Sequence, residues 1–533
     1  MVFQKKWATK AFPLILIFIS ALVALAIRWP HFFWDAALGQ IEEEARHTYS
    51  AMSGPLWIDL MRNVVGQTQP ILEYALRKFF WLPILGIDER APRLISLLYG
   101  LGSIALSAQI LSTILIEKYS FRRWSAGFAT FLGLSWILLS EQHIFYSVMA
   151  RHYSFLLFIS AAFSYLYFLR GGLERASTRW ISFIFINSHF FALIPVGVAF
   201  AVRFFTLRGF SARLRLSLEV FLGLLATIAL NYRALSLLVF SPPSGQEKLS
   251  AFAAAVAAAR DYFRFWESDT GLGFLAALVF FSVVAIGGFR KKNFHFVLLL
   301  LGPVLFATFW LLRKSSGYVV EPRYLFVFWG FIPVLVGEFM GSASQKAEEL
   351  SPRSLGRFRS VLCLLPLLLF TKPLFNSSVT FDRNSFRLPP RMFTRYAEAY
   401  QWVKERVGDE AVLLLSDTCY THETPMLYLR YFPDPHLGAL FLEDTFGCLG
   451  HPMTESREQI DTVLRLYPGA IVVFDSRGID CGGLAKRAGS PSGDGERIDV
   501  GIACMQVFRG IRDFNGIKEA ALKTGFRHHP DFF

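Results

Sequence analysis

The chain has 533 residues, of which 53% are hydrophobic and only 18% are charged, and its mean hydropathy is +0.40. Soluble proteins carry about 25% charged residues, so this composition excludes an ordinary soluble globular protein. The formal net charge of +13 would suit a nucleic-acid partner, but the basic residues cluster in short segments between apolar stretches, which argues against one.

The N-terminal residues "MVFQKKWATK" are basic and lead into the apolar stretch "AFPLILIFISALVALAI". A cleaved signal peptide is one interpretation, because Ala24-Leu25-Ala26 fits a small-x-small cleavage site. An uncleaved first transmembrane helix is the other, and the many apolar stretches that follow favour it. Both interpretations place the next loop on the outer side of the membrane.

Apolar stretches with almost no charge recur along the first 375 residues. A helix needs about 18 or more such residues to cross about 30 Å of hydrocarbon. We place eleven spans, of which the fifth and sixth are short and poorly separated, near residues 11–27, 93–116, 125–140, 154–169, 178–188, 190–202, 217–236, 271–288, 295–312, 324–341 and 360–375. The sequence therefore predicts an α-helical polytopic membrane protein.

The basic residues between these spans indicate the orientation. Loops on the cytoplasmic side of a membrane are enriched in Lys and Arg. With the N-terminus inside, every inward segment holds at least three such residues, for example Arg170, Arg175 and Arg179 in one and Arg203, Arg208, Arg213 and Arg215 in the next. This orientation leaves two large parts outside, which are the first loop at 28–92 and everything after the transmembrane domain 1–375.

The first outer loop has the pattern of a membrane-surface structure. The stretches "LGQIEEEARHTYSAMS" and "QPILEYALRKFFWLPIL" both have helical periodicity with mixed polar and apolar faces. Such helices lie at the membrane surface with their apolar faces in the headgroup region. We interpret the loop as a site for an amphiphilic substrate, with a lipid tail in the bilayer and a polar head outside.

Residues 376–533 change in character. The stretch "RMFTRYAEAYQWVKERV" is periodic like a helix, and "AVLLLSD", "AIVVFDS" and "IACMQVF" are short runs typical of strands. The sequence predicts a small α/β domain outside the membrane. Four cysteines, Cys419, Cys448, Cys481 and Cys504, would lie in an oxidising compartment there, and three disulfide pairings are open.

Four segments, in order, resemble a known family. They are "TQPILEYAL" at 68–76, "PRLISLLYG" at 92–100, "YSVMARHYSFLL" at 146–157 and "EPRYLFVFWGFIP" at 321–333. Each is similar to an element of the GT-C glycosyltransferases, in the bacterial branch related to protein O-mannosyltransferases and lipid A aminoarabinose transferases. The resemblance covers residues 11–375 and adds little on the C-terminal domain.

This resemblance implies a GT-C fold and a function. The family transfers a sugar, with inversion, from a polyprenyl-phosphate donor to an acceptor outside the cytoplasm, which could be a glycolipid, a polysaccharide or a protein. The expected location is a bacterial inner membrane, with the N-terminus in the cytoplasm and the C-terminal domain on the other side.

A lipid-phosphate leaving group requires cations beside it. Arg151 and Arg323 fall at outer ends of predicted spans and inside matched segments, and guanidinium groups bind phosphate oxygens in a bidentate way. We expect Tyr153 and Tyr324 to add hydrogen bonds, while Gln69 stands where relatives often carry His or Lys. The alternative is that the arginines reach to lipid headgroups and that the tyrosines belong to the interfacial aromatic belt.

Inverting transfer also needs a carboxylate that takes the proton of the acceptor hydroxyl. Asp35 follows the first span and Trp34, as the first acidic residue of the family does, although the family often reads Asp-Glu where this chain has Asp35-Ala36. Counting back from "TQP" instead favours Glu43 or Glu44. The alternative for the two glutamates is a solvated face of the surface helix.

His189 is a candidate metal ligand, because some relatives bind a divalent metal with a histidine near this position. A lone histidine at a helix end is more often a hydrogen-bonded interface residue.

Two other functions stay open for the whole chain. One is a non-catalytic relative that binds a lipid or a partner, and the other is a lipid or sugar transporter, which the few charges inside the predicted spans disfavour.

Overall fold

The computed structural model describes residues 15–29, 70–85, 90–240, 250–256 and 322–350, and six strands after residue 411. By its internal contacts the chain divides into two compact units. The first contains the helices from Arg93 onward together with the helix Ile15–Trp29 and α4 (Leu72–Leu76), and the second contains the strands.

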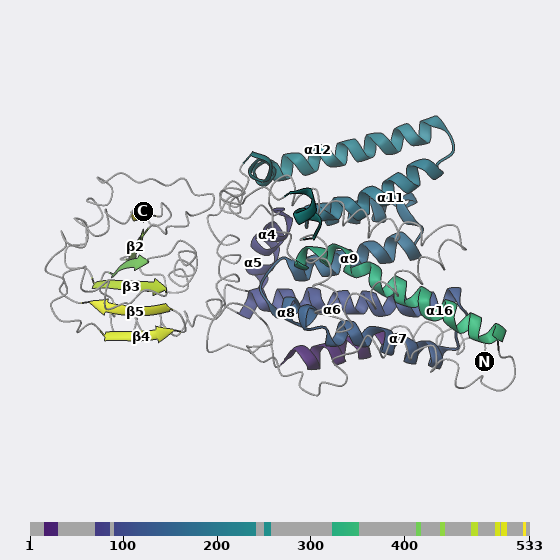
Figure 1. Cartoon of the computed structure of the whole chain (residues 1–533), viewed down its shortest axis with the longest axis horizontal. Coiled ribbons are helices and arrows are strands. Elements are labelled where there is room, and N and C mark those ends of the chain that lie inside the picture. The colour runs from purple at the N-terminus through teal and green to yellow at the C-terminus, as the bar shows by residue number, and fades with distance from the viewer. Residues whose placement is uncertain are drawn as a thin grey trace. The chain divides into compact units, whose positions relative to one another are not determined.

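The first unit is a layered helical bundle (Figure 1). Most of its helices coincide with predicted spans. The helices are α6 (Arg90–Thr113) with its extension η3 (Ile114–Lys118), α7 (Arg123–Leu139), α8 (Glu141–Val148), α9 (Tyr153–Leu169), α10 (Ala176–Ile186), η5 (Phe190–Ala192) with α11 (Leu193–Thr206), α12 (Phe210–Phe240), and η6 (Pro322–Phe331) with α16 (Ile332–Leu350). The short helix α8 was not expected from the sequence. The spans predicted at 271–288, 295–312 and 360–375 lie outside the described residues.

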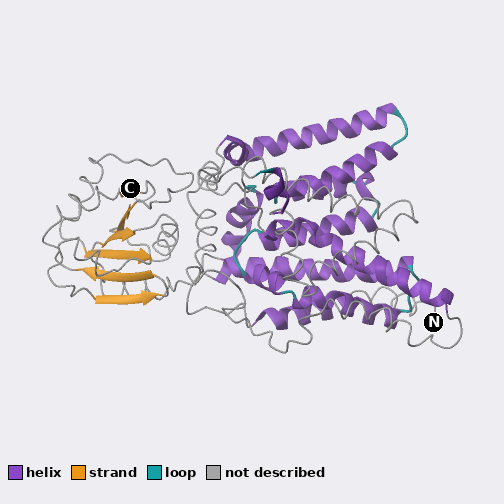
Figure 2. Ribbon diagram, in the orientation of Figure 1, coloured by secondary structure: helices purple, strands orange, loops and turns teal. Residues whose placement is uncertain are grey.

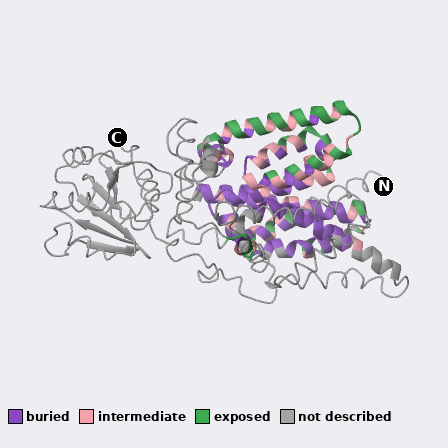
Figure 3. Ribbon diagram, turned by 45° about the horizontal axis from the view of Figure 1, so that its top comes forward, coloured by how far each residue is buried: buried purple, intermediate pink, exposed green. Residues whose placement is uncertain are grey.

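Two stretches are long and apolar enough to cross a membrane by length and composition, Ala91–Lys118 and Phe210–Tyr232. Several shorter apolar helices accompany them, including Ile15–Trp29 and Tyr153–Leu169. The two long stretches differ in burial. In Ala91–Lys118, 56% of the most apolar 18-residue window is buried, whereas in Phe210–Tyr232 the buried share is only 17%. Figure 3 shows the difference as a largely exposed α12 at the edge of a buried bundle.

The pair α9 and η6 forms the centre of the bundle. Ser160 donates a hydrogen bond to the Val327 carbonyl (2.9 Å) and accepts one from the Gly330 amide (2.9 Å). A Cβ at position 330 would run into the backbone of Ser160 and Ala161, so only glycine permits this approach. These two bonds tie an unusually long 3₁₀ segment to α9, since such segments rarely exceed about four residues.

Near its middle, α16 is tied to the end of η3, the extension of α6. Glu338 is buried, forms an ion pair with Lys118 and accepts a hydrogen bond from the Tyr119 hydroxyl (2.8 Å). Burial and the nearby carboxylate raise the pKa of Tyr119, so this hydroxyl keeps its proton and donates. The contact fixes η6 and α16 along the length of the bundle.

The strands of the second unit form one mixed sheet in the order β4-β5-β3-β1-β2-β6 (Figure 2). They are β1 (Val412–Ser416), β2 (Leu437–Leu442), β3 (Ile471–Arg477), β4 (Glu496–Val500), β5 (Ala503–Phe508) and β6 (Phe526–His528). β1 pairs in parallel with β2 and β3, and the other pairs are antiparallel. Three of the strands, β1, β3 and β5, coincide with runs that the sequence marks as strands. The predicted helix at 391–407 and the cysteines other than Cys504 lie outside the described residues.

Candidate functional site

Residues 146–157, which we call the hub segment, comprise the end of α8, a tight turn and the start of α9. The turn forms because α8 ends at Val148 and Met149 turns to an extended conformation (φ −75°, ψ 134°). His152 then begins α9 as its N-cap residue. Arg151 lies in the turn, where its amide donates to the Met149 carbonyl (2.7 Å).

The hub segment contacts all three of the other segments that resemble the GT-C family. It meets residues 321–333 through Phe326, whose ring lies edge-on to Tyr146 (5.1 Å between centroids) and to Tyr153 (6.0 Å). The aromatic rings of residues 146–157 and 321–333, which are far apart in the sequence, thus pack against one another.

The other two segments reach the hub from α6 and α4. Tyr99 packs edge-on against Phe155 (5.0 Å), and Gly100 lies so close to Ser147 that a Cβ there would collide with its side chain. Tyr74 lies near His152 (6.5 Å between ring centroids). All four segments that the sequence singles out therefore converge at one end of the helical unit.

Arg151 is the buried cation of the hub segment, and Arg93 in the 92–100 segment is buried as well. Its side chain is 8% exposed, and its guanidinium carbon lies 5.1 Å from the centre of the Tyr153 ring. A cation held over an aromatic face in a buried setting keeps its charge while its rotation is restricted. Arg151 and Tyr153, two predicted phosphate-binding residues, thus lie side by side.

The remaining predicted residues are placed less completely. Arg323 and Tyr324 belong to η6, within one turn of Phe326, and their side chains are not described. Asp35, Glu43, Glu44 and Gln69 lie outside the described residues. Pro70, the residue after Gln69, is buried.

His189 is buried between α10 and η5, and its ring stacks on that of His152 (6.1 Å, 24° between planes). Its Nδ1 accepts a hydrogen bond from the Phe191 amide (3.2 Å). A neutral ring whose Nδ1 accepts carries its proton on Nε2. Within the described part of the chain no three His, Cys, Asp or Glu side chains form a metal-binding group, and the metal-binding role of His189 stays a prediction.

An asparagine pair holds the start of the 68–76 segment in place. The Ile71 amide donates to Asn231 Oδ1 (2.9 Å), and Asn231 Nδ2 donates to Asn187 Oδ1 (2.7 Å). Asn231 leaves the helical conformation (φ −118°, ψ 20°) and kinks α12. The kink therefore orients the polar side chain that fixes α4 next to the hub segment.

Sequence reasoning missed a buried polar cluster on the other side of the hub. Arg28, at the end of the helix Ile15–Trp29, donates to His143 Nδ1 (2.8 Å) and to the Ala24 carbonyl (3.2 Å). Ser103 lies 2.9 Å from the His143 Nε2. Arg28 and His143 are both fully buried. The only signal in the sequence was an arginine directly after an apolar stretch, which is also the ordinary pattern of a span end.

Burial and the Arg28 charge lower the pKa of His143 well below 6.5. The imidazole is therefore neutral, and its Nδ1 is free to accept from the guanidinium while Nε2–H donates to Ser103. The cluster ties the end of the first helix to α6 and α8. Asp35 follows seven residues after Arg28 in the sequence.

No protein-family model matches this sequence, and no curated protein sequence matches it. A match does exist among solved structures, to ArnT from Cupriavidus metallidurans bound to undecaprenyl phosphate. The identity is 13% and the TM-score is 0.53, over 92% of this chain and 98% of that one. The chain has the fold of ArnT. The apo crystal structure of ArnT gives a similar result, with 12% identity and a TM-score of 0.52 over 94% of this chain and 98% of the other.

The likeness to ArnT supports the GT-C fold that the four sequence segments predict. At such low identity it shows the fold alone. The function must therefore be argued from the residues that the fold brings together.

Proposed function

We propose that this protein is an integral membrane glycosyltransferase that transfers a sugar from a polyprenyl-phosphate donor to an acceptor outside the cytoplasm. The observation that carries the proposal is the convergence of the four family-like segments on the buried cation Arg151. The fold adds support, because ArnT, which has the same fold, was crystallised with undecaprenyl phosphate.

In this proposal the phosphate of the donor lies beside Arg151. The acceptor hydroxyl attacks the anomeric carbon of the sugar from the opposite side, the bond from that carbon to the phosphate oxygen breaks, and polyprenyl phosphate leaves. Negative charge grows on the phosphate as the bond breaks, so fixed guanidinium groups stabilise the transition state. Arg151 supplies one such group, Arg323 a second, and Tyr153, Tyr324 and Gln69 add neutral hydrogen bonds.

The proton of the acceptor hydroxyl must go to a carboxylate within hydrogen-bond reach. We assign this role to Asp35, with Glu43 and Glu44 as alternatives. The first outer loop, 28–92, would cover the donor from outside, and residues 376–533 would form an extracytoplasmic domain.

The assignment of the base is tested by a transfer assay with full-length protein, labelled polyprenyl-phosphate sugars and membrane acceptors. We expect Asp35→Asn to lower transfer at least about 100-fold, the usual size of a general-base contribution, and to leave donor binding unchanged. Glu43→Gln and Glu44→Gln are the matched controls, because each also removes one acidic charge from the same loop.

Normal transfer by Asp35→Asn, with loss in either glutamine variant, would move the base to that position. Normal transfer by all three variants would contradict the enzymatic proposal and favour a non-catalytic lipid-binding protein. Vectorial movement of the labelled donor without transfer would instead indicate a transporter.

A further inference from the structure

Seven arginines gather at the end of the bundle opposite to the hub segment. They lie on the turn between α9 and α10, on the turn between α11 and α12, and in the ends of α10, α11 and α12 next to these turns. We call them the arginine cluster, and they are Arg170, Arg175, Arg179, Arg203, Arg208, Arg213 and Arg215. Residues 170–219 contain only two acidic residues, Glu174 and Glu219, and no lysine, so this region carries a net charge of +5.

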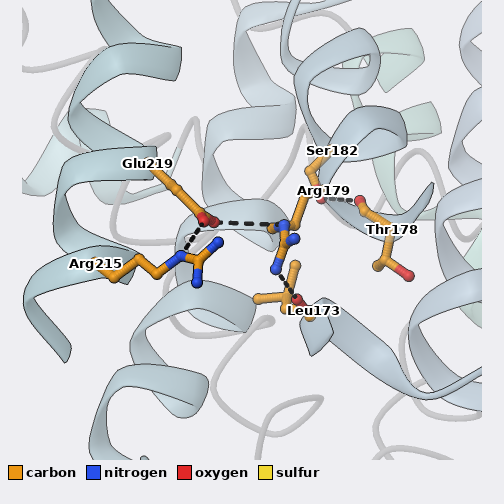
Figure 4. Close-up of polar contacts among 6 residues, drawn as sticks. All are labelled: Leu173, Thr178, Arg179, Ser182, Arg215 and Glu219. Atoms are coloured by element: carbon orange, nitrogen blue, oxygen red, sulfur yellow. Dashed lines mark hydrogen bonds and ion pairs between the residues drawn. The ribbon is translucent and has the colours of Figure 1, made fainter. Parts of the chain in front are cut away.

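The two glutamates engage only part of this charge. Glu219 lies between Arg179 (3.4 Å) and Arg215 (3.3 Å), as Figure 4 shows. Glu174 pairs with Arg203 (3.0 Å). Exposed ion pairs of this kind contribute about 0–1 kcal/mol each, so they do not hold the guanidinium groups against a competing anion.

The other four arginines have no carboxylate partner within the described part of the chain. Two of them are held against aromatic rings, Arg170 over Tyr165 (5.1 Å) and Arg213 over Phe204 (5.6 Å). Arg175 and Arg208 are exposed, and among the described residues their side chains form neither hydrogen bonds nor ion pairs. The cluster therefore presents uncompensated positive charge.

Large apolar side chains surround this charge. Trp180 is 68% exposed, Phe205 76% and Phe210 82%. Phe210 is also the first residue of the apolar stretch Phe210–Tyr232, which is long enough to cross a membrane. Aromatic residues beside arginines at the end of such a stretch are typical of the headgroup region of a bilayer.

The cluster is separate from the proposed donor site. Arg151 precedes α9 and Tyr153 is its first residue, whereas Arg170 follows its last residue. A helix of 17 residues is about 25 Å long, so the two groups of cations face opposite ends of the bundle.

We propose that the arginine cluster binds the phosphate headgroups of anionic phospholipids in the surrounding bilayer. Guanidinium groups bind phosphate oxygens bidentately, and basic pockets at the ends of membrane helices bind such headgroups. A bilayer lipid is the occupant that also covers Trp180, Phe205 and Phe210, because its acyl chains bury these side chains, which a free anion leaves in water. This inference goes beyond the proposed glycosyltransferase activity and does not depend on it.

The test is isothermal titration calorimetry, in which dioctanoylphosphatidylglycerol is titrated into the full-length protein in uncharged detergent. Parallel titrations use dioctanoylphosphatidylcholine and inorganic phosphate. Each arginine near an anionic lipid surface contributes about five-fold in affinity. We therefore expect the double variant Arg175→Gln, Arg208→Gln to bind the phosphatidylglycerol roughly 25-fold more weakly.

Two variants on the same turns serve as matched controls. Glu174→Gln removes a negative charge and should tighten binding of the phosphatidylglycerol. This effect is opposite in sign to that of the arginine variants, and a loss of folding would not produce it. Ser211→Gln leaves the charge unchanged and should bind like the wild type. Undecaprenyl phosphate should bind the double variant as it binds the wild type at the hub end.

Three results would overturn the proposal. The first is equal affinity of the double variant and the wild type for phosphatidylglycerol. The second is equal affinity of the wild type for phosphatidylcholine, which has no net charge. The third is binding of inorganic phosphate as tight as that of the lipid, which would indicate a site for a free anion.

Discussion

At the scale of single residues, the buried pair Arg28–His143 has the largest consequence for stability. Burying a guanidinium is costly unless its donors are satisfied. His143 satisfies one of them only while its ring is neutral, because a protonated ring has no acceptor nitrogen. The pair therefore couples the fold to pH through one histidine.

We predict that acid destabilises the folded protein through His143. The pKa of this residue is lowered in the folded state, so well above pH 6.5 the ring is neutral in both states and the contribution is complete. Below that pH the unfolded chain takes up a proton that the folded chain refuses, and the free energy of unfolding falls by about 1.4 kcal/mol per pH unit. The fall continues until the pH reaches the folded pKa.

The measurement is denaturant unfolding in mixed micelles at pH 7.5, 6.5 and 5.5, for the wild type and for His143→Gln. All other histidines are the same in both proteins, so the difference between the two isolates His143. The wild type should lose about 1 kcal/mol more than the variant between pH 6.5 and 5.5, because the unfolded histidine is already half protonated at pH 6.5. Parallel curves for the two proteins would show that His143 is not the group responsible.

At the scale of elements, the contact between η6 and α9 determines whether the 321–333 segment meets the hub segment. Ser160 supplies the two hydrogen bonds, and Gly330 provides the space for the two backbones to approach. Phe326 lies between these anchors and the aromatic rings of Tyr146 and Tyr153.

We predict that Gly330→Ala destabilises the protein by about 1–3 kcal/mol or more, because the added methyl group forces the packed backbones apart. Gly223→Ala, in the exposed helix α12, is the matched control. A Cβ at Gly223 meets nothing within 4 Å, so this change should be neutral or stabilise by up to about 1 kcal/mol. The thermal midpoints of the two variants in detergent, at one scan rate, provide the comparison, and equal midpoints would show that the approach at Gly330 is not tight.

The sequence identified the segments of the site better than their contacts. Apolar runs and family-like motifs were sufficient to locate α6, α9, η6 and Arg151. They could not show that Ser160 binds the η6 backbone or that Asn231 holds Ile71, because such bonds join residues more than 150 positions apart. Arg28 and His143 were missed for the same reason, since neither carries a motif and only the fold brings them together.

At the scale of the whole molecule, the bundle separates two groups of cations. The hub end holds Arg151 among buried aromatic rings, and the opposite end holds the exposed arginine cluster. In our account the first is buried because it must bind a phosphate away from water, and the second is exposed because its partner is the bilayer itself.

The measurement that tests the central claim most directly is undecaprenyl phosphate binding by the full-length wild type and by Arg151→Gln. The account predicts binding at least about ten-fold weaker in the variant, since a lost charge-assisted hydrogen bond costs about 1.5–3 kcal/mol, with partial recovery in Arg151→Lys. Arg122→Gln, an exposed change outside the hub segment, should bind like the wild type. Equal affinity of Arg151→Gln and the wild type, with both proteins folded, would contradict the account.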